Sequence, residues 1–366
     1  MGSEMCIRDR IYRDKFGIPM VKVKEASWYR KIDSERVQCI LCPHNCVIPN
    51  GKRGFCGVRE NKKGTLYTLI YGLASALNID PIEKKPLYHF YPGSPIVSVS
   101  TAGCNFRCPW CQNYNISQAR PEELFLEELD PSVLIKYSLE TKTPFIAFTY
   151  NEPLIWYEYI LDVCKLAVKH DIKLVLVTNG YINLEPLEEL VKYINAANVD
   201  IKAFSEETYR RYIKADLRPV LEATEFMKEK GVHIETTYLV IPELNDSLDE
   251  FKQMVHWHLE TLGAETPLHI SRFFPMYKFI DRNPTPVKTL KSLWETAKRE
   301  GLHYVYVGNL PGNEGENTYC PKCGQPVISR IGFWITGWKL TRDNRCINCG
   351  AKIPIIGYRW PGSSGG

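Results

Sequence analysis

The sequence predicts an α/β protein centred on a partial (β/α)6 barrel of the TIM type, with a cysteine-rich extension before it and a small cysteine-containing unit after it. From residue 96 to about residue 307, short β-branched runs alternate with amphipathic helical patterns. Such repeated strand–helix units imply parallel strands joined by right-handed crossovers. Cysteines cluster before, inside and after this region. We therefore expect a loop-rich extension over residues 1–95, the barrel over 96–310 and a separate unit over 318–360.

Seven segments carry strand signals: Ile96–Ser100, Phe145–Thr149, Lys173–Val177, Val199–Lys202, His233–Val240, Leu268–Phe273 and Tyr304–Val307. Helical patterns lie between them, at Ser132–Thr141, Leu154–His170, Leu184–Ile194, Asp246–Leu262 and Val287–Glu300. About six units favour an incomplete barrel over a doubly wound sheet. In such barrels the chemistry lies on residues at the carboxyl ends of the strands.

Composition excludes several classes of protein. The 366 residues are 44% hydrophobic and 24% charged, which is ordinary for a globular chain, and the net charge of +4 is too small to indicate a nucleic-acid or membrane partner. No apolar stretch reaches the roughly 18 residues of a membrane span, and the first residues lack the apolar segment of a signal peptide. Of the 13 cysteines, all but Cys6 and Cys164 fall in tight groups, which indicates metal sites in a reducing cytoplasm rather than a disulfide framework.

The most informative group is Cys104, Cys108 and Cys111, which directly follows the first expected strand. A C-x3-C-x2-C run offers three thiolates to a [4Fe–4S] cube, one fewer than full ligation requires, so one iron is left open. A zinc loop is the alternative, but zinc sites are usually built from two separated pairs. The spacing, with the aromatic Trp110 before the third cysteine, resembles that of radical S-adenosylmethionine (SAM) enzymes. The resemblance implies that SAM binds the open iron and that its reductive cleavage releases a 5′-deoxyadenosyl radical.

Polar residues at the ends of later strands are candidates to bind SAM. The run Thr-Tyr-Asn-Glu-Pro resembles the Gly-Gly-Glu-type motif that binds the methionine amino group, but both glycines are absent, so only Glu152 and the local backbone around Asn151 carry over. The alternative is a pair of helix N-cap residues. Thr178 and Asn179 end the third strand, where they could reach the SAM carboxylate or ribose, but Asn-Gly turns are common.

Three further candidates lie on the fourth and sixth strands. Asp200 and Lys202 resemble the Asp-x-Lys of glycyl-radical-enzyme activases, in which the lysine could pair with the SAM carboxylate. A structural ion pair is the alternative. His269 is expected to face inward and contact adenine or substrate, although a lone strand histidine is more often simply hydrogen-bonded.

The extension carries four cysteines within 18 residues, Cys39, Cys42, Cys46 and Cys56, which form a closed site. Either a structural zinc ion or an auxiliary [4Fe–4S] cluster would suit four thiolates, and His44 could replace one of them.

The last unit carries two Cys-x2-Cys knuckles separated by 22 residues, Cys320, Cys323, Cys346 and Cys349, each pair followed by glycine. This pattern predicts a zinc ribbon or rubredoxin-like unit, with zinc favoured over iron. About 45 residues cannot build a sufficient core alone, so the metal must supply folding energy.

Taken in order, several motifs resemble the radical SAM enzyme of the AmmeMemoRadiSam system over about residues 37–357: Cys-Pro-His-Asn-Cys46, Lys52–Asn61, Asp80–Phe90, Ala102–Cys108, Cys111-Gln-Asn, Tyr150–Pro153, Asn198–Lys202, Val307-Gly-Asn-Leu and the terminal knuckles. The family is similar to pyruvate formate-lyase-activating enzymes. The resemblance implies Memo-type and AMMECR-type partner proteins, and radical SAM chemistry requires a flavodoxin- or ferredoxin-type electron donor. It leaves the substrate open: a glycyl residue of a partner enzyme, or another protein or small molecule. A non-catalytic metal-binding scaffold is the alternative from a different class.

The polar segment Asp80–Phe90 resists interpretation from sequence. Glu83, Lys84, Lys85, Tyr88 and His89 are too polar and too close to the barrel entry to suggest core residues. They would either line a substrate channel or form a solvated linker before the first strand.

Overall fold

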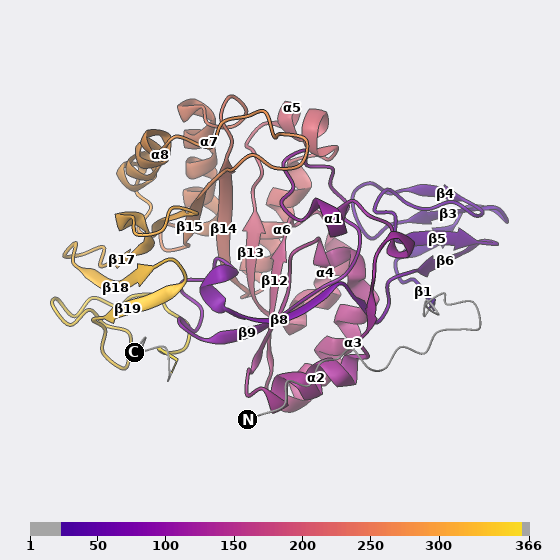
Figure 1. The fold of residues 1–366 in the computed structure, drawn as a ribbon, viewed down its shortest axis with the longest axis horizontal. Coiled ribbons are helices and arrows are strands. Elements are labelled where there is room, and N and C mark those ends of the chain that lie inside the picture. Colours follow the sequence, from indigo (N-terminus) through magenta and orange to yellow (C-terminus); the bar gives the residue numbers. More distant parts are fainter. Residues whose placement is uncertain (1–22, 361–366) are drawn as a thin grey trace.

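The computed structural model describes residues 23–360, and its centre is an eight-stranded sheet (Figure 1). Seven strands lie parallel in chain order: β9 (Pro95–Ser100), β11 (Phe145–Phe148), β12 (Lys173–Thr178), β13 (Ile194–Asp200), β14 (His233–Val240), β15 (Leu268–Arg272) and β16 (Val305–Gly308). An eighth, β8 (Ala76–Pro81), pairs antiparallel with β9 at one edge. The parallel strands follow one another across the sheet in chain order, and β8 and β16 are its two edge strands.

Helices connect every successive pair of parallel strands: α1 (Tyr114–Ser117), α2 (Pro131–Glu140), α3 (Tyr157–Ala167), α4 (Leu184–Leu190), α5 (Glu206–Thr208), α6 (Arg218–Glu229), α7 (Leu248–Trp257) and α8 (Val287–Glu300). Alternate strand residues divide between two hydrophobic clusters. Val97, Ile146 and Leu174 pack with helix residues, whereas Ile96 and Phe145 face the other side of the sheet. The expected alternation of strands and helices is therefore confirmed. Within residues 23–360, none of the helices is both long and apolar enough to cross a membrane.

The fourth parallel strand differs from its expected range. The sequence predicts a strand over Val199–Lys202, but β13 begins at Ile194 and ends at Asp200. Ala196 and Ala197 carry no strand preference of their own, yet both are fully buried and paired on both sides, with β12 and with β14. Pairing from two neighbours overrides weak propensity here.

The extension is built from short strands rather than loops. One three-stranded sheet contains β2 (Tyr29–Lys31), β3 (Arg36–Cys39) and β4 (Val47–Pro49), and another contains β1 (Lys24–Glu25), β5 (Arg59–Lys62) and β6 (Thr65–Thr68). A further pair joins β7 (Leu73–Ala74) to β10 (Glu127–Glu128). Because β8 belongs to the central sheet, the extension ends before residue 76 rather than at residue 95. Residues 1–22 of the expected extension lie outside the described residues.

A buried ion pair anchors the extension to the central domain. Arg59 Nη2 donates to both carboxylate oxygens of Glu158 on α3 at 2.8 Å, and both side chains are almost fully buried. Ser27 completes the joint, because its amide donates to Glu158 at 2.7 Å and its carbonyl accepts from Arg59 at 3.1 Å. Every charge in this joint therefore has a partner.

The C-terminal unit packs at the opposite side of the molecule from the extension (Figure 1). Its strands β17 (Thr318–Tyr319), β18 (Pro326–Ile331) and β19 (Trp334–Trp338) form an antiparallel sheet. The buried Arg330 of β18 donates to the Tyr88 carbonyl at 3.1 Å, and the backbones of Tyr91 and Ile356 join at 2.8 Å. The unit is therefore held by the chain segment of residues 82–92.

This segment, which we term the amino-end plug (residues 82–92), fills the space beside the first residues of the parallel strands. Leu87 and Phe90 pack with Ile96 and Phe145, close to the starts of β9 and β11. Glu83, Lys85 and His89 are buried as well, with relative exposures of 1%, 1% and 0%. The expectation of a channel or solvated linker is wrong for these three residues, because each has polar partners inside the protein. Lys84, with a side chain that is 44% exposed, does lie at the surface.

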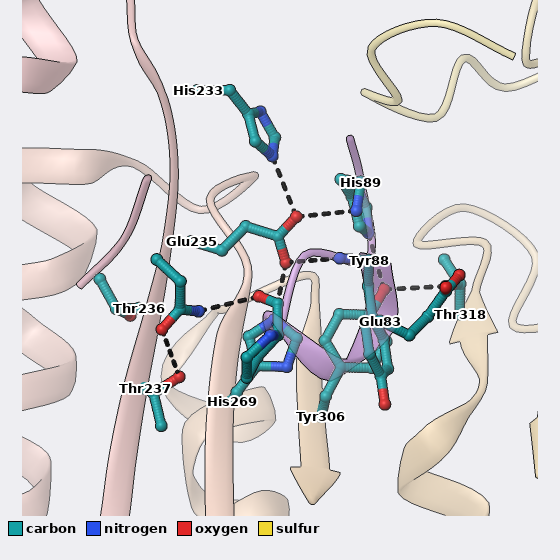
Figure 2. Close-up of polar contacts among 12 residues, drawn as sticks. Glu83, Tyr88, His89, His233, Glu235, Thr236, Thr237, His269, Tyr306 and Thr318 are labelled. Atoms are coloured by element: carbon teal, nitrogen blue, oxygen red, sulfur yellow. Dashed lines mark hydrogen bonds and ion pairs between the residues drawn. The ribbon is translucent and has the colours of Figure 1, made fainter. Parts of the chain in front are cut away.

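Glu235 of β14 supplies the central polar contact of the plug (Figure 2). Its carboxylate accepts from the amides of Tyr88 and His89 at 3.0 and 2.8 Å, and contacts His233 Nε2 at 3.0 Å and His269 Nε2 at 2.6 Å. The two ring contacts in particular hold the pKa of Glu235 far below its usual range despite its burial. A buried carboxylate with four partners fixes the plug in one position.

We predict that Glu158→Ala destabilises the protein strongly, because it leaves a buried, unpaired guanidinium. The expected loss in free energy of unfolding is about 3–5 kcal/mol, measured by urea denaturation. Glu140→Ala, which removes the exposed partner of Lys136, is the control and should cost less than about 1 kcal/mol. Equal losses in both variants would contradict the anchoring role of the buried pair.

We also predict that the buried His89 makes the protein less stable as the pH is lowered. Burial lowers the pKa of His89 to about 3, against about 6.5 in the unfolded chain. The folded state therefore binds fewer protons below pH 6.5, so stability is complete above that pH and declines as pH falls. Between pH 7.5 and 5.5, His89 should contribute up to about 1.4 kcal/mol per pH unit to the slope of stability against pH in urea denaturation, and His89→Asn should lose this contribution. The exposed His170→Asn should leave the slope as in the parent, and an unchanged slope in His89→Asn would refute the prediction.

Candidate functional site

The candidate site is the cysteine loop, residues 101–113, which leaves the carboxyl end of β9. Cys104, Cys108 and Cys111 are free thiols. The Phe106 amide donates to Cys104 Sγ at 3.3 Å, and Cys111 Sγ lies 3.1 Å from Ser117 Oγ. Hydrogen-bond donors of this kind stabilise thiolates, so the donor set suits an iron–sulfur cluster.

Asparagine side chains from the loop and from the next strand end hold it in place. Asn151, just after β11, donates to the Gly103 carbonyl at 2.8 Å and accepts from the Thr101 amide at 3.2 Å. Asn113 at the far end of the loop donates to the Tyr150 carbonyl at 2.8 Å. Both ends of the loop are therefore tied to the residues that follow β11. Asn151 serves the loop directly and so acts here as a positioning residue.

The middle of the loop is tied to the residues that follow β12. Asn105 is 1% exposed and donates to the Tyr181 carbonyl at 2.8 Å. Its Oδ1 accepts from Asn179 Nδ2 at 2.9 Å. Asn179, a sequence-predicted SAM contact, thus touches the cysteine loop.

Glu152 joins the ends of β11 and β12. Its carboxylate accepts from Thr178 Oγ1 at 2.6 Å and from the Asn179 amide at 2.7 Å. It also accepts from the Leu154 amide at 3.0 Å, which makes it the N-cap of a short 3₁₀ turn. Burial raises the pKa of Glu152 to about 7. The structure therefore brings Glu152, Thr178 and Asn179 together beside the loop, and Glu152 fills the helix-capping role as well.

Asp200 and Lys202 lie at the end of β13, and Lys202 Nζ is 2.7 Å from Asp200 Oδ2. Burial opposes the charge on Lys202, but Asp200 and the Cys108 thiol together raise its pKa. The Lys202 carbonyl accepts from Asn245 Nδ2 at 2.8 Å, which fixes the local backbone. A cation therefore stands close to the cysteine loop, where it can attract an anionic group.

His269 does not lie with these residues. Its ring bonds to Glu235 and stacks on Tyr306 at 5.1 Å, inside the polar contacts of the amino-end plug (Figure 2). His269 is only the second residue of β15, so its side chain stands toward the start of the strand. The expectation that it contacts adenine or substrate is therefore wrong, and the alternative of a hydrogen-bonded core histidine holds.

Gly103 brings the cysteine loop against the extension. It has a φ of +86°, and a Cβ there would lie 2.8 Å from the Cys56 carbonyl oxygen and 2.6 Å from Val58 Cγ1. Arg107 reinforces this joint, because its guanidinium donates to the Cys104 carbonyl at 2.8 Å and also to the Phe55 carbonyl. Glycine is required by the packing as well as by the backbone conformation.

A cavity of about 560 Å³ opens beside this joint, between the extension and the residues that follow the cysteine loop. Its charged lining is mainly basic: Lys52, Arg53, Arg107 and Arg120, with Glu60 as the acidic member. Arg53 pairs with Glu60 at 2.9 Å and with Glu122 at 2.8 Å, whereas Arg107 donates to backbone carbonyls. Cys56 and Ser117 also line the cavity, so it reaches both the extension's cysteines and the hydroxyl beside Cys111.

The C-terminal cysteine site (Cys320, Cys323, Cys346 and Cys349) is compact. Its four sulfurs lie within 4.8 Å of one another, with 3.5 Å between Cys320 and Cys349 and 3.7 Å between Cys323 and Cys346. Such a group could bind a metal ion. It lies with the amino-end plug, away from the cysteine loop.

Comparison with known proteins agrees with this geometry. Residues 98–257 match the model of the Radical SAM superfamily. Over 335 residues, 91% of this chain and the whole of the relative, the chain is 45% identical to Uncharacterized protein MJ0808 of Methanocaldococcus jannaschii. The chain belongs to the family of that protein and carries a radical SAM domain. It is thus a radical SAM enzyme, and its family implies a [4Fe–4S] cluster and SAM.

More distant relatives include activating enzymes. The chain is 25% identical to the pyruvate formate-lyase-activating enzyme of Clostridium pasteurianum over 156 residues, 42% of this chain and 65% of that enzyme. It is 21% identical to a putative glycyl-radical enzyme activating enzyme of Methanocaldococcus jannaschii over 167 residues, 43% of this chain and 67% of that protein. Among solved structures, a radical SAM methyltransferase from Sphaerobacter thermophilus aligns with a TM-score of 0.48 and 12% identity, covering 81% of this chain and 82% of that one.

Sequence reasoning missed the residues that hold the cysteine loop: Gly103, Asn105, Arg107 and Asn113. All four lie inside or beside the cysteine motif, and this position was the one sequence feature that could have indicated their role. Their roles depend on backbone carbonyls contributed by distant segments, such as those of Phe55 and Tyr181. Spacing within the motif carries no information on those partners.

We predict that Gly103→Ala separates the cysteine loop from the extension, because its new Cβ would collide with the Cys56 carbonyl. After anaerobic iron–sulfur reconstitution the variant should hold much less iron per chain than the parent. Gly231→Ala is a matched control, since Gly231 has a φ of +85° and open space around its Cβ position. Equal iron contents in the two variants would show that the close approach at Gly103 does not matter.

Proposed function

We propose that the protein cleaves SAM reductively at its cysteine loop and uses the product to abstract hydrogen from a protein, peptide or small-molecule substrate. The observation that carries this is the loop of three free thiols at the end of the first parallel strand of a radical SAM domain. Cys104, Cys108 and Cys111 would hold a [4Fe–4S] cluster through three irons. When bound, the cluster supplies the electron that breaks the C–S bond of SAM and yields the 5′-deoxyadenosyl radical.

The chain's own residues would orient SAM. Lys202 offers a cation near the loop for the methionine carboxylate, with Asp200 holding its ammonium at 2.7 Å. Glu152 Oε2, which accepts one amide hydrogen bond, keeps capacity for the methionine amino group. Asn151, Thr178 and Asn179 fix the strand ends that would carry these contacts.

A second candidate function is activation of a glycyl-radical enzyme, which the similarity to activating enzymes favours. An activase should generate a glycine-centred EPR doublet in a co-encoded partner. The resemblance to the AmmeMemoRadiSam system instead suggests that Memo-type or AMMECR-type proteins present the substrate. If co-encoded glycyl-radical enzymes show no doublet, activation is excluded, and presentation of the substrate by a Memo-type or AMMECR-type protein is the remaining candidate.

We also propose that the C-terminal cysteine site holds zinc. Four tetrahedral ligands at the zinc–sulfur distance of about 2.3 Å place their sulfurs about 3.8 Å apart. The 3.5 and 3.7 Å separations agree with that spacing. Zinc there would stabilise the small unit that closes the amino end of the sheet. The free thiols and the iron–sulfur chemistry fit the reducing environment of the cytoplasm.

The main prediction concerns SAM cleavage. Anaerobic, reconstituted protein with dithionite and SAM should produce 5′-deoxyadenosine and methionine, measured by mass spectrometry. Cys108→Ala should produce neither, because the cluster loses a ligand, whereas Cys164→Ala, which removes a buried lone thiol, should remain active. A fully loaded parent protein that forms no 5′-deoxyadenosine with or without co-encoded partners would contradict the proposal.

We further predict that an acidic ferredoxin or flavodoxin reduces the enzyme by binding at the basic cavity. Lys52→Glu combined with Arg120→Glu should raise the KM for that donor about tenfold at low salt, because like charges then oppose docking. Turnover with dithionite should not change. Lys322→Glu, an exposed charge reversal on the C-terminal unit, is the control. A donor KM that all these variants leave unaltered would place the docking surface elsewhere.

A further inference from the structure

The extension brings four thiols into one place, which we term the N-terminal cysteine site (Cys39, Cys42, Cys46 and Cys56). The amide of Cys39, at the end of β3, donates to the Cys46 carbonyl at 3.0 Å, just before β4. Cys46 Sγ in turn accepts from the Phe55 amide at 3.4 Å. Cys39 is buried in the main hydrophobic cluster, and Cys42, Cys46 and Cys56 pack against that cluster. These contacts hold the segments that carry the four cysteines against one another.

His44 is not part of this site. Its Nε2 lies 2.8 Å from the Asn105 carbonyl, and its ring packs on Phe55 at 4.2 Å and on Tyr181 at 5.1 Å. The idea that His44 replaces a thiolate therefore fails. The site is a set of four cysteines, which is the ligand set of a fully ligated [4Fe–4S] cluster or of a structural zinc ion.

The sulfur spacing separates these two cases. Among residues 23–360, the C-terminal cysteine site is the only group of three or more Cys, His, Asp or Glu ligand atoms that all lie within 4.8 Å of one another. The N-terminal cysteine site does not meet this limit, and neither does the set of three in the cysteine loop. A single zinc ion needs sulfurs about 3.8 Å apart. A cube places each thiolate on a different iron and so holds its sulfurs farther apart.

The N-terminal cysteine site also touches the cysteine loop directly. Gly103 packs on the Cys56 carbonyl, and Arg107 of the loop donates to the carbonyl of Phe55, the residue before Cys56. The Asn105 carbonyl meets His44, which lies between Cys42 and Cys46. These contacts join the segment that carries the N-terminal cysteine site to the cysteine loop.

We propose that Cys39, Cys42, Cys46 and Cys56 bind an auxiliary [4Fe–4S] cluster that passes electrons to the cluster of the cysteine loop. In each transfer the auxiliary cluster loses one electron and is oxidised, and the loop cluster gains that electron and is reduced. The electron comes from a ferredoxin- or flavodoxin-type donor. The cavity of about 560 Å³ that Cys56 lines gives such a donor access. The relay rests on the proposed function, whereas the identity of the metal does not.

The decisive experiment removes the cysteine loop's thiols and leaves the N-terminal cysteine site intact. The full chain with Cys104→Ala, Cys108→Ala and Cys111→Ala is reconstituted anaerobically, and iron and zinc are counted per chain. We expect about eight iron atoms and one zinc ion in the parent, and about four iron atoms and one zinc ion in this variant. After dithionite reduction, the variant should give a [4Fe–4S] EPR signal that SAM does not alter. About two zinc ions and no iron in the variant, or an N-terminal site without metal, would overturn the proposal.

The relay has its own test in Cys42→Ala combined with Cys46→Ala. This variant should keep about four iron atoms, and its 5′-deoxyadenosine formation should fall at least about tenfold with the protein donor but not with dithionite. Cys164→Ala is the control and should match the parent in metal content and rate. Unchanged donor-driven turnover would overturn the relay. If the proposed function itself fails, the parent makes no 5′-deoxyadenosine, but the iron count of the loop variant still decides the metal.

Discussion

The close approach of Gly103 to the Cys56 carbonyl is the constraint on which the candidate site depends. A side chain at this position would overlap the extension, so the cysteine loop takes its path only because residue 103 is glycine. Arg107 and Asn105 then hold the same joint through backbone carbonyls. As a consequence, the cysteine loop packs directly against the segment that carries the N-terminal cysteine site.

The two ends of the parallel sheet carry different tasks. At the carboxyl ends, polar side chains hold the cysteine loop and line the place where a ligand would bind. At the amino ends, the plug and the C-terminal unit close the sheet around Glu235, whose carboxylate has four polar contacts. Because the plug is rigidly bonded, the strands are fixed at one end and present their other ends to the loop. The C-terminal cysteine site accordingly lies with the plug at the amino ends of the strands, whereas the N-terminal cysteine site lies against the cysteine loop at their carboxyl ends.

The sequence predicted the strand–helix alternation and the cysteine loop well, because both depend on local periodicity and spacing. It failed where a long-range partner decides the outcome. Ala196 is in a strand because strands pair with it on both sides, and His269 lies in the plug because Glu235 of the neighbouring strand binds it. From sequence, Glu83 is expected to line a channel or to lie in a solvated linker, yet the Gly93 amide donates to it at 2.8 Å inside the protein. The contact between the two thiol sets was equally invisible, since it joins segments about fifty residues apart.

The central claim is that the cysteine loop leaves one iron of its cluster open for SAM. Electron–nuclear double resonance on the reduced enzyme, with SAM labelled with ¹⁵N in the methionine amino group and ¹⁷O in its carboxylate, tests this directly. The account predicts hyperfine coupling from both labels, lost when SAM is replaced by an unlabelled molecule. An intact, reduced cluster in the loop that shows no coupling to either label at saturating SAM would contradict the account.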